Sequence, residues 1–179
     1  MNQTDQFRIL SIAPTTRGFG YAVFEGENSL VVYGGKIVTT SKRNKNRRSL
    51  ALIEKMIVQY RPDALVLYDL HAKGIHRQPR IKELHRLVVK LAKRHKLKTV
   101  TISRTELQRL LLGDLKGTKH GVAELLAKQF PDQLASRLPP KRKCGHTEDR
   151  RMDIFDAVGL AVAFRSKSIL RETKTAKSD

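Results

Sequence analysis

Residues 9–24 read ILSIAPTTRGFGYAVF, and this stretch decides the fold. Residues 7–13 predict a buried strand, the turn PTTRG follows at 14–18, and residues 19–24 predict a second strand. A tight turn and the apolar residues 30–38 then predict a third strand. Because short turns join these consecutive strands, we expect them to form an antiparallel meander.

Strands and helices alternate in the rest of the chain. A basic loop is expected over residues 41–48. The segments with helical spacing of apolar residues are 50–60, 80–93 and 153–163. The short apolar strands between them are 64–68 and 97–102. Ser103 and Glu106 form a capping box, and Thr118 caps a further helix. A meander followed by this alternation predicts an α/β fold with helices on both faces of a mixed sheet.

Length and composition bound the class of protein. The 179 residues suit one domain, expected over residues 1–170 with a disordered basic tail at 171–179. No apolar run is long enough for a transmembrane helix, and the first ten residues lack the layout of a secretory signal. Cys144 is the single cysteine and excludes an internal disulfide, so a cytoplasmic protein is expected.

Positive charge is the strongest compositional signal. Lys and Arg number 36 against 17 Asp and Glu, which gives a net charge of +19. Three clusters carry almost no acid, at residues 41–48, 71–98 and 141–143. One such cluster is typical of a solvated surface, but three favour a polyanionic partner because an uncompensated surface repels itself. Aromatic residues make up only 6%, so we expect recognition of a nucleic-acid backbone and shape rather than base stacking.

The candidate phosphate contacts are basic residues of these clusters and of the first turn. They are Arg17, Lys73, Arg77, Arg80, Lys141, Arg142 and Lys143. For Arg17, an ordinary turn residue is the alternative interpretation.

Three aspartates carry the chemical signal. Asp153 and Asp156 lie three residues apart on an otherwise apolar helix, where two like charges are costly to bury. Carboxylate oxygens are the preferred ligands of Mg²⁺ and Mn²⁺, and such an ion would remove that cost. Asp69 follows a buried strand, the place where ligands bind in open α/β sheets. The alternatives are a helix cap for Asp153 and a turn residue for Asp69.

A fourth carboxylate is missing from this pattern. Two-metal phosphodiester cleavage uses three or four acidic groups around ions about 4 Å apart. The position at the end of the first strand holds Ala13, and Ser11, Thr15 and Thr16 supply no charge in its place.

From residue 9 to residue 163 the chain resembles the RuvC-type Holliday-junction resolvases of the ribonuclease-H-like superfamily. The matching pieces are the strand–turn–strand opening, the strand before Asp69, the segment KGTK at 116–119, and the helix with Asp153, Asp156 and Ala157. The resemblance implies a five-stranded mixed sheet in the order 3-2-1-4-5, a homodimer, and Mg²⁺-dependent cleavage of branched DNA in recombination and repair.

The family's functional residues transfer unevenly. Its second carboxylate, normally Glu, falls on Asp69, and its last two fall on Asp153 and Asp156. Its phosphate-contacting lysines fall on Lys116 and Lys119, for which simple solvation is the alternative. Its first aspartate falls on Ala13, which predicts weak or single metal binding and inefficient cleavage.

Two other functions stay open from the sequence. One is a non-catalytic module that binds structured RNA on the same fold, and the other is processing of ribosomal RNA precursors, as in the YqgF-like branch. A zinc site at Cys144 and His146 is disfavoured because no second ligand pair is present.

Overall fold

The structure, a computed structural model, describes residues 6–26, 28–70, 78–113, 117–143, 145 and 147–175. These residues form a five-stranded sheet in the order β3-β2-β1-β4-β5. Its strands are β1 (Arg8–Pro14), β2 (Gly18–Glu25), β3 (Ser29–Ile37), β4 (Ala64–Tyr68) and β5 (Lys98–Ile102). The helices are α1 (Lys42–Tyr60), α2 (Pro79–Arg94), α3 (Arg104–Leu112), α4 (Lys119–Gln129), α5 (Pro131–Leu134), a 3-10 turn η1 (Ala135–Arg137) and α6 (Met152–Thr175).

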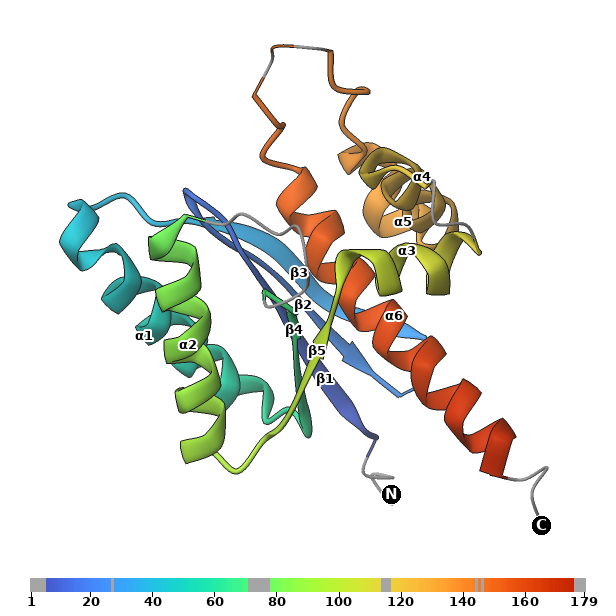
Figure 1. Cartoon of the computed structure of the whole chain (residues 1–179), viewed down its shortest axis with the longest axis horizontal. Helices are drawn as coiled ribbons and strands as arrows, with labels where there is room; N and C mark the ends of the chain where they lie inside the picture. The colour runs from blue at the N-terminus through green and yellow to red at the C-terminus, as the bar shows by residue number, and fades with distance from the viewer. Residues whose placement is uncertain are drawn as a thin grey trace.

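The sheet has the predicted mixed topology. β1, β2 and β3 pair antiparallel as a meander, whereas β4 lies parallel to both β1 and β5. Helices α1 and α2 cover one face, and α6 with α3, α4 and α5 covers the other (Figure 1). The expected α/β architecture, strand order and helical layers are therefore confirmed.

The crossover helices bring their N-termini to one end of the sheet. β1 and β4 finish at the end where α1, α2 and α6 begin (Figure 1). For α1 and α2 this follows from the connections β3–α1–β4 and β4–α2–β5 between parallel strands, in which the helix returns antiparallel to the strands. The N-terminal ends of helices carry partial positive charge, so this end of the molecule favours anions.

Two small residues of the sheet, Gly20 and Ser11, let α6 approach closely. A Cβ atom added to Gly20 would lie 1.8 Å from the carbonyl oxygen of Asp153, so only glycine leaves room for the first turn of α6. One turn later, the buried Ser11 hydroxyl donates to the Ala157 carbonyl at 2.7 Å. Together these contacts fix α6, and with it Asp153 and Asp156, against the ends of β1 and β2.

Two boundaries differ from the sequence expectation. Residues 41–48 are not a loop, because α1 begins at Lys42. Lys and Arg are good helix formers, but a run of charged residues has no apolar periodicity that would indicate a helix. Helix α6 continues to Thr175, past the expected boundary at residue 170, and residues 176–179 lie outside the described part. Within the described residues, no helix combines the length and apolarity needed to cross a membrane.

Candidate functional site

A cleft of about 320 Å³ lies where β1 and β4 end beside α6. We call it the acidic cleft, after Glu148, Asp153 and Asp156 in its wall. The remaining lining residues are Pro14, Thr15, Thr16, Arg17, Tyr68, Ile81, Lys119 and Thr147. Of the three aspartates expected here, two are present, and Asp69 does not line the cleft.

Asp153 is the most buried acid of the cleft, with 9% of its surface exposed. Burial, and then the neighbouring charge of Asp156, raise the pKa of Asp153 to about 6. The Thr15 hydroxyl donates to Asp153 Oδ2 at 3.3 Å. Asp153 lies within the first turn of α6, which begins at Met152, so it is not the residue that precedes the helix as an N-cap.

Asp156 is held by two side chains from elsewhere in the chain. Lys119 Nζ lies 2.6 Å from Asp156 Oδ2 and 2.7 Å from Glu148 Oε2. The Tyr68 hydroxyl at the end of β4 donates to Asp156 Oδ1 at 3.3 Å. Lys119 is the first residue of α4, whose N-cap Thr118 accepts from the Gly121 backbone N–H as expected.

Two arginines connect the cleft to its surroundings. Arg17 donates to the Glu148 carbonyl at 3.1 Å. The Arg80 guanidinium donates to the Thr15 carbonyl and, at 2.9 Å, to Asn46 Oδ1 on α1. Partial burial lowers the pKa of Arg80, although a guanidinium stays charged at any physiological pH. Arg80 therefore anchors the turn before β2 to α1 and α2.

The cleft does not fit a two-metal centre. Ala13, 1% exposed, lies in the apolar cluster between the sheet and α6, so the residue at that place supplies no ligand beside Asp153 and Asp156. Among the described residues, no three Asp, Glu, His or Cys side chains form a group that could hold a metal ion. The cation that the acids do contact is the ammonium of Lys119. The assignment of a metal to Asp69, Asp153 and Asp156 stays a prediction.

A larger cleft of about 1080 Å³ adjoins the acidic one and shares Arg17, Lys119, Thr147 and Glu148 with it. We call it the basic cleft, because cations dominate its wall. The other basic residues lining it are Arg104, His120, Lys141, Arg142, Lys143, Arg150 and Arg151. Its two acids are already engaged, Glu148 by Lys119 and Asp149 by Arg151, whose guanidinium lowers the pKa of Asp149 to about 2.

The structure brings most of the described candidate phosphate contacts to these two clefts. Arg17 and Lys119 line both, and Lys141, Arg142 and Lys143 line the basic cleft. Arg80 joins them through its bond to Thr15. The remaining candidates, Lys73, Arg77 and Lys116, lie outside the described residues, as do Cys144 and His146.

Sequence reasoning gave too little weight to Glu148 and missed Tyr68. From the sequence, Glu148 is a favourable negative charge before the last helix, whereas in the structure its side chain contacts Lys119 inside the cleft. Its position five residues before Asp153 was the available signal. No sequence pattern marks Tyr68, because its role depends on where β4 ends relative to α6.

The architecture has close counterparts among solved structures. RuvC from Thermus thermophilus aligns with a TM-score of 0.68 at 14% identity, covering 92% of this chain and 96% of that chain. The same organism's RuvC in complex with a Holliday junction substrate aligns at 0.66, again at 14% identity, covering 88% and 92%. The yeast mitochondrial Holliday junction resolvase Ydc2 aligns at 0.58 and 14% identity, covering 93% and 81%.

The chain has the RuvC-like ribonuclease-H fold. No protein-family model and no curated protein sequence matches it. Because identity to these solved structures is 14%, they establish the fold and not the roles of individual residues.

Proposed function

We propose that this protein binds branched DNA through the basic cleft and that its acidic cleft is a degenerate nuclease site. The observation that carries the proposal is the joining of the two clefts at the carboxyl end of β1 and β4. Helix N-termini and six basic residues face a phosphate backbone there, namely Arg17, Arg104, Lys141, Arg142, Lys143 and Arg150. A RuvC of the same fold, in complex with a Holliday junction substrate, supports branched DNA as the ligand.

The site residues perform binding and positioning rather than efficient cleavage. The basic cleft neutralises phosphates, and Arg17 and Lys119 bridge it to the acids. Asp69, Asp153 and Asp156 are the remnant of the acidic constellation, with Ala13 at the place of its missing member. We expect Mg²⁺ or Mn²⁺ to bind only weakly there, because Ala13 stands where a carboxylate of a two-metal site would be.

A competition assay tests the binding. A labelled four-way junction is bound in EDTA and displaced by unlabelled junction, by linear duplex of the same composition, or by structured RNA. We expect junction to compete at least about tenfold better than duplex. The logarithm of the association constant should fall with the logarithm of salt with a slope of about −5, as six neutralised phosphates require. Preferential displacement by RNA would favour the RNA-binding alternative instead.

A cleavage assay tests the degenerate site. The wild-type chain is expected to leave four-way junctions intact in Mg²⁺ or Mn²⁺. Ala13→Asp adds a negative charge on the sheet face that packs against α6, which favours a divalent ion over the Lys119 ammonium, and we expect this variant to gain measurable nicking. Robust nicking by the wild type would contradict the proposal. The homodimer stays a prediction, which sedimentation velocity checks.

A further inference from the structure

The ammonium of Lys119 bridges two carboxylates in the wall of the acidic cleft. Its Nζ atom lies 2.6 Å from Asp156 Oδ2 and 2.7 Å from Glu148 Oε2. The Lys119 side chain is 20% exposed and that of Asp156 is 11% exposed, so the contact is largely shielded from water. An ordinary surface lysine keeps its ammonium in water, whereas Lys119 places it between two carboxylates.

We propose that Lys119 is a built-in cation that replaces a divalent metal in this cleft and closes it to Mg²⁺ and Mn²⁺. This inference rests on the proposed function only in treating the cleft as a nuclease-type acidic site. The Lys119 charge explains how Asp153, Asp156 and Glu148 can lie in one cleft without a bound metal ion. It also implies that nucleic-acid binding by this protein needs no metal.

Geometry makes the two cations mutually exclusive. Mg²⁺ sits about 2.1 Å from its carboxylate oxygens, whereas the ammonium already lies 2.6 Å from Asp156 Oδ2. An ion bound to that oxygen beside Glu148 would overlap the ammonium or stand within a few ångströms of a like charge. Repulsion at that distance is strong in a partly buried site.

The local charge balance points the same way. Asp153, Asp156 and Glu148 face Lys119 from α4 and Arg17 from the turn before β2. Two of the three negative charges are therefore already balanced by cations of the chain itself, which weakens the attraction of the cleft for a divalent ion.

The same contacts restrict the role expected for Lys119 by resemblance. Two of the three N–H donors of the Lys119 ammonium are committed to carboxylates, which leaves one for a phosphate. In the DNA-free protein, Lys119 is therefore a positioning residue that joins α4 to α6 and to the loop before it.

The test uses Lys119→Met, which keeps the hydrocarbon stem and removes the charge. We expect a lower melting temperature because the shielded Asp156 and the more exposed Glu148 lose their partner, and we expect millimolar Mn²⁺ to restore it. Mn²⁺ affinity, measured by the loss of the free-ion electron paramagnetic resonance signal, should be at least about tenfold higher than in the wild type. Lys119→Arg keeps a cation and should behave like the wild type.

Lys167→Met is the matched control. Lys167 Nζ lies 2.6 Å from Glu106 Oε1 with a similarly shielded side chain, but it contacts a single carboxylate. This variant should lose stability without recovery in Mn²⁺. Equal Mn²⁺ binding by wild type and Lys119→Met, or no binding by either, would overturn the proposal.

The wild type alone keeps the inference testable if Lys119→Met fails to fold. Mn²⁺ broadens amide NMR signals near its site, so selective broadening at Thr15, Arg17 and Asp153 in the wild type would overturn the inference. Unchanged signals there support it. These measurements contain no nucleic acid, so failure of the DNA-binding proposal and failure of this one are distinguishable.

Discussion

The acidic cleft and the basic cleft share a wall, yet they balance their charges differently. In the acidic cleft, Asp156 and Glu148 meet the ammonium of Lys119. In the basic cleft, Arg104, Lys141 and Lys143 form no ion pair with any described residue. One cleft is neutralised by the chain itself, while the other keeps an excess of positive charge that an external anion must balance. The difference is the basis of both proposals, metal exclusion from the acidic cleft and DNA binding by the basic cleft.

The largest expected effect concerns the basic cleft. Reversing Lys141, Arg142 and Lys143 to Glu removes about three phosphate contacts and lowers the salt slope by about 3. At about 0.1 M salt this corresponds to roughly a 500-fold loss of affinity for the four-way junction. Fluorescence anisotropy over a range of salt concentrations measures both quantities.

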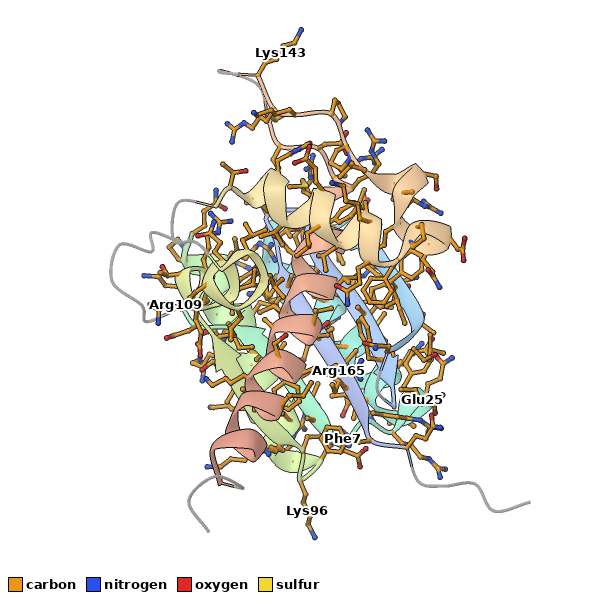
Figure 2. All side chains as sticks on the ribbon, turned by 90° about the vertical axis from the view of Figure 1, so that its right-hand side faces the viewer. Phe7, Glu25, Lys96, Arg109, Lys143 and Arg165 are labelled. Atoms are coloured by element: carbon orange, nitrogen blue, oxygen red, sulfur yellow. The ribbon has the colours of Figure 1, made fainter. Side chains whose placement is uncertain are left out.

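A matched charge reversal elsewhere tests whether location matters. Lys55, Lys96 and Lys98 are exposed and belong to the far end of the fold, near the end of α1 and the start of β5. Figure 2 shows Lys143 and Lys96 at opposite ends of the molecule. Changing all three to Glu alters the net charge equally, and only a modest loss of affinity is expected. An equal loss of affinity in both triple variants would show that net charge, and not the basic cleft, determines binding.

The sequence predicted the scaffold better than it predicted the balance of charges. Buried strands such as Ala64–Tyr68 are continuous apolar runs, and Ser103 and Thr118 cap the helices as expected. The prediction of a loop over residues 41–48 was wrong, because a run of Lys and Arg has no apolar periodicity to indicate the start of α1. Such local signals fix elements, and the order of elements restricts the sheet topology.

The acidic cleft could be predicted only in part because it depends on distant contacts. Asp153 and Asp156 were identifiable from their spacing on an apolar helix. That Lys119 ends between Asp156 and Glu148 depends on how α4 docks on α6, which no local pattern encodes. Tyr68 reaches Asp156 from the last position of β4, and the side-chain alternation along β4 predicts this only once the strand's end is known.

A pH experiment sharpens the account of the acidic cleft. The pKa of Asp153 in the folded protein is about 6, against an ordinary value of 3.8, so the native state holds a proton that the unfolded chain has lost. This contribution to stability is complete below about pH 4 and is lost as the pH rises through 6. Asp153→Asn stays neutral and keeps an acceptor for Thr15.

The variant should therefore gain stability relative to the wild type as the pH rises, by up to about 3 kcal/mol at neutral pH. Urea unfolding near pH 4 and near pH 8 measures the difference. A constant difference between the two proteins at both pH values would show that Asp153 titrates normally. DNA affinity at neutral pH should change much less than in the triple variant of the basic cleft.

The smallest expected effect tests whether the acidic cleft can be disturbed without loss of DNA binding by the basic cleft. Gly20→Ala directs a methyl group at the Asp153 carbonyl, 1.8 Å from the new carbon, so the first turn of α6 must shift. We expect a loss of about 2 kcal/mol in the free energy of unfolding. Gly35 is the cross-strand partner of Gly20, and a Cβ there meets nothing within 4 Å. Gly35→Ala should therefore be nearly neutral. Because the exposed residues 141–143 do not depend on that turn, junction affinity should change little in either variant, and a large loss in Gly20→Ala alone would mean that the acidic cleft itself holds the DNA.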